Sequence, residues 1–173
     1  MLSSKEYDSW VCFYEDDTAF ERFWNNPKRY LPVLKRFEGV VAPDFSLYRD
    51  MPLVMQEWNI YRSRALAHWL QENGIPVIPN LRWGDERTYK LCCSGISKGG
   101  TIAVGSHGCI KLLQEREQFS KGLEYVVRHV QPDTIVVYGT APDCIFEEYR
   151  KGGIAVKQFD SDYMMAHRKA VSQ

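Results

Sequence analysis

Long apolar runs are missing from this 173-residue sequence: none reaches the roughly 18 residues needed to cross a bilayer. The first eight residues contain no apolar signal-peptide segment. Lys plus Arg number 22 and Asp plus Glu number 22, so net charge is also absent. This balance argues against bulk nucleic-acid binding, which depends on cations that neutralise phosphates. We therefore expect a cytoplasmic protein with no membrane association. The charge balance does not exclude a small local phosphate-binding site.

Paired cysteines are missing as well. The sequence has five cysteines but no C-x-x-C spacing, and zinc sites usually need such short pairs. Thiols of an intracellular protein stay reduced. We expect free thiols and no metal site, and the sequence indicates no particular cofactor. The cysteines are Cys12, Cys92, Cys93, Cys109 and Cys144.

Short apolar runs alternating with helical stretches dominate the sequence. The runs from the second to the fifth are continuously apolar, which is typical of strands buried on both faces of a parallel sheet. The connections are long enough for crossover helices. The sequence therefore predicts an α/β fold with a mainly parallel sheet of about six strands, either an open twisted sheet or a partial TIM-like barrel. The expected strands cover 10–14, 39–45, 75–79, 101–105, 134–139 and 154–159.

The longest predicted helix covers residues 52–73. Apolar residues including Val54, Trp58 and Tyr61 recur in it every three or four positions, which predicts that they face the core. Arg62, Arg64 and Lys111 are interpreted as scattered solvated charges. The other expected helices are a short or broken one after Pro27 and those over 86–93, 117–130 and 144–150. With no repeat or linker, this length predicts a single domain over 1–173, in which 160–173 is a loosely held tail.

Polar residues collect where the predicted strands end. In parallel α/β folds the loops at the carboxyl ends of the strands meet and bind ligands. The loops at the opposite ends, such as 72–74, are plain turns. We therefore expect Asp44, Arg82, His107 and Tyr138 to surround one shared pocket. The polar loops cover 43–50, 80–85, 105–109 and 138–143.

Two candidate catalytic residues lie in these loops. Asp44 suits general acid–base work, but an aspartate in a loop is equally a capping residue. His107 suits the role of a base. It lies between Ser106 and Gly108, whose backbone amides would hold an anion if a helix followed directly. The plainer interpretation of this string is a tight turn with a half-buried Cys109.

The candidate ligand-binding residues include one guanidinium in the 80–85 loop. Arg82 suits a carboxylate or phosphate through its planar guanidinium, although an ion pair with Asp85 or Asp44 is the structural alternative. For Asp85, a helix cap is favoured over catalysis.

Aromatic rings complete the candidate set. Trp83 and Tyr138 suit stacking on a base or sugar, and alternatively they cover the end of the sheet. Tyr48 and Arg49 are candidates from the 43–50 loop.

Four strings resemble a phage and mobile-element family, domain-of-unknown-function family 4417. They are VAPDFSLYRDMP at 41–52, WNIYRSR at 58–64, GIPVIPNLRWGD at 74–85 and VVYG at 136–139. The resemblance covers most of the chain and implies a bacterial or bacteriophage setting. It implies no activity and no catalytic residues, but three of the strings contain or adjoin predicted strand ends.

The leading functional hypothesis is a pocket that binds a small anionic ligand, a nucleotide or other phosphorylated metabolite, in order to sequester or degrade it. Arg82 would bind the anion, Trp83 or Tyr138 would stack, and Asp44 and His107 would carry any acid–base chemistry. One alternative is a protein-binding module that blocks a host factor without turnover. Another is a metal-dependent phosphodiesterase with Asp44, Asp50 and Asp85 as metal ligands.

Overall fold

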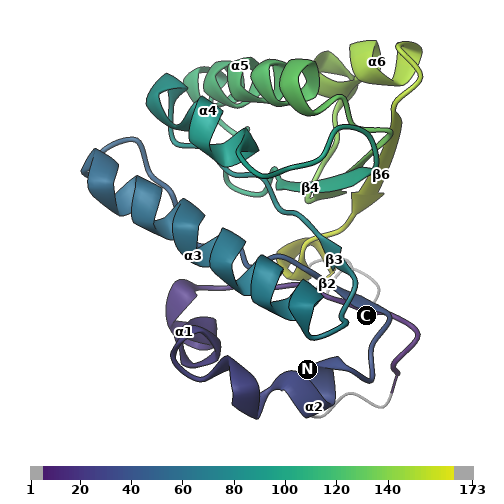
Figure 1. The fold of residues 1–173 in the computed structure, drawn as a ribbon. Helices are drawn as coiled ribbons and strands as arrows, with labels where there is room; N and C mark the ends of the chain where they lie inside the picture. Colours follow the sequence, from purple (N-terminus) through teal and green to yellow (C-terminus); the bar gives the residue numbers. More distant parts are fainter. Residues whose placement is uncertain (1–5, 166–173) are drawn as a thin grey trace, which may run out of the picture. The chain divides into compact units, whose positions relative to one another are not determined.

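The computed structural model describes residues 6–165, which divide into two compact units (Figure 1). Unit 1 comprises residues 6–92 and unit 2 residues 93–165. Six strands lie within this described range, three in each of two sheets, and every strand pairing is parallel. The predicted α/β class, the strand number and the parallel pairing are confirmed, while the strands form two sheets rather than one. The expectation of a single domain stays a prediction.

Unit 1 builds its sheet in the order β1-β2-β3, with short strands. The register places Val40 opposite Val77. Pro76 and Pro79 flank β3 and lack the N–H groups that would extend it, so β3 is only two residues long, as the prolines predict. The elements are β1 (Trp10–Val11), α1 (Asp17–Asn25), the 3₁₀ helix η1 (Pro27–Arg29), α2 (Leu31–Leu34), β2 (Gly39–Val41), α3 (Leu53–Glu72), β3 (Val77–Ile78) and α4 (Glu86–Cys93).

The apolar face of α3 is not where the sequence predicts it. Val54, Trp58 and Tyr61 are 69%, 49% and 57% exposed, so the expectation that they belong to the core is wrong. The helix instead buries a face that carries apolar residues such as Ile60 together with polar ones such as Asn59. Buried polar side chains such as Asn59 and Arg62 form hydrogen bonds inside the unit, and apolar periodicity cannot identify a buried face that contains such residues.

Unit 2 builds its sheet in the order β4-β5-β6, and α5 and α6 cover one face of it (Figure 1). Ile135 and Val137 of β5 are fully buried, and Phe119 of α5 meets Phe146 of α6 with ring centroids 6.2 Å apart. The elements are β4 (Thr101–Gly105), α5 (Leu113–Val130), β5 (Thr134–Tyr138), α6 (Asp143–Lys151) and β6 (Ala155–Phe159).

The far end of the chain is described only in part. Ser161 is 1% exposed, and its hydroxyl lies 3.3 Å from Nδ1 of His107 in unit 2. The expected tail began at residue 160, and its last part, residues 166–173, lies outside the described residues. Within the described range, no helix has the length and apolar character that spanning a bilayer requires.

Candidate functional site

The candidate site of unit 1 begins where β2 and β3 end side by side. Ala42 N donates to Ile78 O at 2.9 Å, so the chain leaving β2 and the chain leaving β3 emerge together. The first brings Asp44 to this edge and the second brings Asn80 and Arg82. The polar loops that follow these two strands therefore meet at one edge of the sheet in unit 1, as the sequence predicts.

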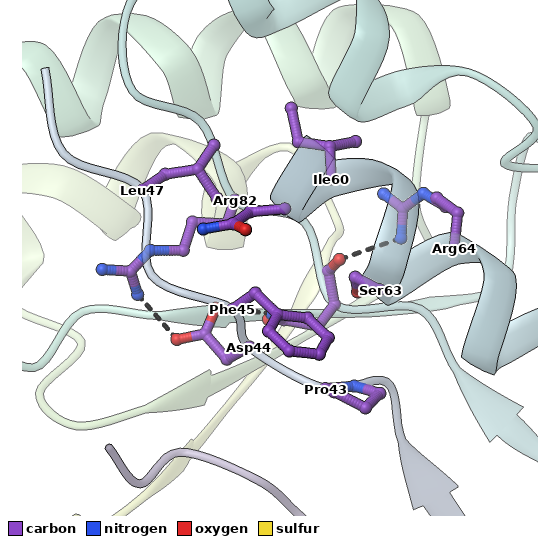
Figure 2. Close-up of a pocket in the computed structure, with 10 residues that line it drawn as sticks. Pro43, Asp44, Phe45, Leu47, Ile60, Ser63, Arg64 and Arg82 are labelled. Atoms are coloured by element: carbon purple, nitrogen blue, oxygen red, sulfur yellow. Dashed lines mark hydrogen bonds and ion pairs between the residues drawn. The ribbon is translucent and has the colours of Figure 1, made fainter. Parts of the chain in front are cut away.

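Asp44 is the centre of this site and is 9% exposed. Its Oδ2 accepts a bond of 2.6 Å from Arg82 Nη1, and the two side chains point toward each other in Figure 2. Its Oδ1 accepts a bond of 2.7 Å from Asn80 Nδ2. The Tyr14 hydroxyl in turn donates to Asn80 Oδ1 at 2.8 Å. We call these four residues, Tyr14, Asn80, Asp44 and Arg82, the strand-end site.

Burial and the hydrogen-bonding partners of Asp44 have opposite effects on the pKa of its carboxyl. Burial raises the pKa of the Asp44 carboxyl above its ordinary value, while the charge of Arg82 and the bond from Asn80 act in the opposite direction. Burial has the larger effect. Asp44 is therefore easier to protonate than an exposed aspartate, although a guanidinium lies against it.

The cavity beside Asp44 is small. Its volume is about 10 Å³, enough for about one water molecule. Ser63 contributes a buried hydroxyl that has no hydrogen-bond partner among the described residues. Arg64 contributes a guanidinium that donates to Asn80 O at 3.0 Å and to Cys92 O at 2.6 Å (Figure 2). The lining residues are Pro43, Asp44, Phe45, Leu47, Asn59, Ile60, Ser63, Arg64, Asn80 and Arg82.

A second layer of polar residues fixes the loop that carries Asp44. Asn59 of α3 donates to Ser46 O at 2.6 Å and accepts a bond of 2.6 Å from Arg62 Nη2. Arg62 also binds Glu21 of α1 at 2.8 Å, and its guanidinium carbon lies 3.9 Å from the centre of the Phe45 ring. These bonds tie the 44–47 loop to two helices.

Arg62 and Arg64 were interpreted from the sequence as solvated charges, and this is wrong. Arg62 is 8% exposed, and Arg64 lines the cavity beside Asp44. The available signal was the spacing of three between Asn59 and Arg62, which puts both on one face of the helix. Their partners lie up to 41 residues away in the chain, which one sequence does not reveal.

Asp85 lies at the start of α4, where a capping role was favoured. Its Oδ1 accepts a bond of 3.0 Å from Arg87 N, and its carbonyl accepts a bond from Thr88 N. The Arg87 side chain also binds it, at 2.7 Å, and this bond is the main reason that the pKa of Asp85 is lowered. Arg49 lies close enough to lower that pKa further.

The two aromatic candidates of unit 1 are both accessible. Tyr48 is 54% exposed, and Trp83, next to Arg82 in the chain, is half-buried. Arg49 is exposed next to Tyr48. These side chains offer ring faces and a further cation in the loops that form the strand-end site.

The candidates of unit 2 follow β4 and β5. His107 is exposed, with Nδ1 3.3 Å from the Ser161 hydroxyl. Ser106 is fully buried and donates to Thr140 O at 2.7 Å. The Tyr138 hydroxyl accepts a bond of 3.0 Å from Asp162 N. His107 and Tyr138 thus lie at the exits of neighbouring strands of one sheet.

Two glycines shape this loop cluster. Gly139 has a φ of +110°, and a Cβ there would lie 2.6 Å from the Ser106 hydroxyl, so only glycine permits this close approach. Gly108 has a φ of +77° and turns the chain after His107. The next helix, α5, begins only at Leu113, so the amides around Ser106 and Gly108 do not form its N-terminus.

The structure brings some predicted residues together. Asp44 and Arg82 are in contact within unit 1, whereas His107 and Tyr138 belong to unit 2. A pocket shared by all four stays a prediction. Across residues 6–165 no group of three or more His, Cys, Asp or Glu is placed to hold a metal ion.

Parallel sheets, crossover helices and a polar cluster at strand ends place the chain among the α/β proteins. It belongs to a family described as Domain of unknown function (DUF4417), whose model matches residues 1–160. The resemblance noted in the sequence is thereby confirmed.

Two curated relatives are phage proteins. The chain is 37% identical over 132 residues to "Gene 1 protein" of Mycobacterium phage L5, a match that covers 76% of this chain and 58% of the relative. It is 36% identical over 132 residues to "Gene 1 protein" of Mycobacterium phage D29, covering 76% and 49%. The chain therefore spans about half the length of these relatives. No solved structure matches it.

Proposed function

We propose that unit 1 binds a small phosphate-bearing anion, a nucleotide or other phosphorylated metabolite, at the strand-end site. Arg82 is the proposed anion contact. The observation that carries the proposal is the pair at this site: Asp44 is 9% exposed and holds Arg82, whose side chain is 23% exposed, at the carboxyl ends of two parallel strands. Ligands of parallel α/β proteins bind at such ends.

The chemistry of the pair supports this role. A guanidinium is planar and carries five N–H donors, so one such group can serve a carboxylate and a phosphate at once. Asp44 accepts from one nitrogen of Arg82. Because burial raises the pKa of Asp44, the carboxyl can take up a proton when a second anion approaches the guanidinium, which lowers the repulsion between the two anions.

The size of the cavity determines how much of a ligand enters it. A volume of about 10 Å³ admits about one water-sized group, so only a phosphate oxygen would enter beside Asp44. The body of the ligand would lie outside, where Tyr48 and Trp83 offer ring faces and Arg49 offers a second cation. Because His107 and Tyr138 belong to the other unit, the proposal rests on Asp44 and Arg82.

The proposed setting is the cytoplasm of a bacterial host. The phage relatives support this setting. Sequestration of a host nucleotide and its degradation both fit the proposed site. Chromatography of the nucleotide after incubation with the protein distinguishes them, because only degradation yields a product.

A melting-temperature screen tests the proposal. Inorganic phosphate and a panel of nucleotides are added to the wild-type chain, to Arg82→Ala and to Arg36→Ala. A ligand at 100 times its Kd adds about 2.7 kcal/mol of stability. We expect at least one panel member to raise Tm in the wild type, and we expect Arg82→Ala to lose that rise.

Arg36→Ala is the matched control, because it removes the same charge from an exposed arginine that stacks on Tyr7. It should keep the rise. The proposal is contradicted if no member of the panel raises Tm. It is also contradicted if the rise in Tm persists in Arg82→Ala.

One observation favours a second candidate, the protein-binding module. Trp58 and Tyr61 of α3 are about half exposed and stack with ring centroids 5.4 Å apart, and Trp24 meets both rings edge-on. Exposed aromatic clusters of this kind are enriched at protein interfaces. A host protein that co-purifies with the wild type and with Arg82→Ala, but not with Trp58→Ala, would favour this candidate over anion binding.

A further inference from the structure

Unit 1 contains a second and larger cavity, between the chain that leaves β1 and helix α1. Its volume is about 220 Å³, and it shares no lining residue with the cavity beside Asp44. We call it the α1 cavity. It is lined by Val11, Cys12, Phe13, Glu15, Ala19, Phe20, Arg22, Phe23 and Tyr30.

Four of the nine residues that line the α1 cavity are aromatic, and their rings pack against one another. Phe13 stacks on Phe23 with centroids 5.1 Å apart and meets Phe20 edge-on at 5.7 Å. Tyr30 meets Phe23 edge-on at 5.8 Å. Each of these four residues is at least 93% buried, so their mutual contacts fix this part of the wall in place.

This space fits one aromatic ring. An apolar cavity of about 150 Å³ is large enough to bind benzene, and the α1 cavity exceeds that volume. A bound ring would contact the small part of Phe13, Phe20 and Phe23 that stays accessible, and aromatic pairs gain energy from stacked and edge-on contacts beyond the area they bury.

The polar residues that line the cavity indicate which polar group a bound aromatic ligand would carry. Arg22 and Glu15 line the cavity and are exposed, and neither side chain makes an ion pair or hydrogen bond with any residue between 6 and 165. Tyr30 is 6% exposed, and its hydroxyl has no hydrogen bond to a described residue.

We propose that the α1 cavity binds a single-ring aromatic carboxylate, with the ring among the phenylalanines and the carboxylate on Arg22. A guanidinium binds a carboxylate through charge-assisted hydrogen bonds. Glu15 beside it would additionally take an ammonium group, if the ligand carries one. This site is separate from the strand-end site and does not depend on the function proposed there.

Cys12 provides a direct reading of occupancy, since its exposed thiol lines the cavity. The full chain is treated with iodoacetamide, and the labelling rates of Cys12 and Cys144 are followed by peptide mass spectrometry. Cys144 is an exposed thiol of unit 2 and serves as the internal control. We expect saturating 3-phenylpropanoate or phenylalanine to slow Cys12 labelling about tenfold, since a site that is 90% occupied leaves a tenth of the thiol accessible, and to leave Cys144 unchanged.

Matched probes and variants assign the contacts. Propanoate lacks the ring and 3-phenylpropanol lacks the carboxylate, so neither should protect Cys12. Arg22→Gln should lose the protection, and Arg36→Gln and Arg82→Ala should keep it. Ala19→Leu, which fills the cavity from α1 with an apolar side chain, should abolish it without loss of folding.

Stronger protection by phenylalanine than by 3-phenylpropanoate would show that the ligand class carries an ammonium for Glu15. The reverse order would show that it does not. Unchanged Cys12 labelling with both ligands would overturn the proposal, and so would equal protection by 3-phenylpropanol or protection that persists in Arg22→Gln.

Discussion

Asp44 and Arg82 are the residues on which the functional account depends, and their burial differs. Asp44 is 9% exposed, whereas the Arg82 side chain is 23% exposed and reaches toward solvent. Removing the cation leaves a carboxylate in a buried place, while removing the acid leaves a cation that water can reach. Substitution of Arg82 and substitution of Asp44 should therefore lower the free energy of unfolding by different amounts. Arg82→Ala should be the more destabilising of the two at neutral pH.

The raised pKa of Asp44 gives a signed prediction for stability. A native carboxyl with a raised pKa binds more protons than the unfolded one, so the stability it contributes falls as pH rises. The contribution is fully present below the ordinary value of 3.8 and is lost as pH rises through the native pKa. The free energy of unfolding of the wild type minus that of Asp44→Asn should therefore decrease between pH 3.5 and pH 7.

Urea denaturation followed by tryptophan fluorescence measures this difference. All five tryptophans lie at positions 10, 24, 58, 69 and 83, so the signal reports on unit 1. A difference that grows with pH would mean that Arg82 and Asn80 outweigh burial and would contradict the assignment.

Among the elements, α3 contributes most to the site through its buried polar face. Asn59 connects the 44–47 loop to Arg62, with two bonds of 2.6 Å. Asn59→Leu keeps a similar size but leaves Ser46 O and one Arg62 nitrogen without this partner. Unsatisfied buried groups cost about 1–3 kcal/mol each.

We expect Asn59→Leu to lower the free energy of unfolding of unit 1 by about 2 kcal/mol or more. Glu57→Ala, an exposed change on the same helix, should stay within about 0.5 kcal/mol of the wild type. Urea unfolding by tryptophan fluorescence measures both. If Asn59→Leu behaved like the control, these bonds would not be holding the loop.

Sequence reasoning succeeded for elements with strong local signals. The predicted strand over 101–105 and the helix over 86–93 coincide with β4 and α4, and α3 differs from its prediction by one residue at each end. Helix α1 was missed because its apolar positions, chiefly Phe20 and Phe23, are few in a charged stretch. The prediction of which face of α3 is buried was wrong, because amide and guanidinium side chains were expected to be exposed. Their hydrogen-bonding partners, which the sequence does not reveal, allow them to be buried.

Only part of the polar cluster at the strand ends could be predicted from the sequence. Arg82 pairs with Asp44, which was one of the two structural alternatives given for it. Tyr14 and Asn80 complete the cluster through a bond between residues 66 apart in sequence. A single sequence gives no information about such a contact, whereas the predicted strand ends did place Asp44 and Arg82 in loops that meet.

Across the whole chain, each unit has its own parallel sheet and its own buried residues. The apolar runs predicted six strands but not which strands pair, because hydrogen-bond partners are set by tertiary packing. The chain between α4 and β4 connects the two units. Its residues Ser94, Gly95, Ser97 and Lys98 are exposed, and Gly95 and Gly99 have positive φ.

Among the sites between residues 6 and 165, limited trypsin digestion should therefore cut first after Lys98. Exposed connections with few side-chain contacts are the preferred sites of proteolysis. Mass spectrometry at early times should show fragments 1–98 and 99–173. First cleavage within α3 or α5 instead would mean that the connection is better protected than those helices.

The most direct test of the strand-end site is a crystal structure grown with the phosphate or nucleotide that gives the largest rise in Tm. The account predicts a phosphate oxygen about 2.7–2.9 Å from the guanidinium of Arg82, beside Asp44. A ligand bound elsewhere on the chain, with the Arg82–Asp44 pair untouched, would contradict it.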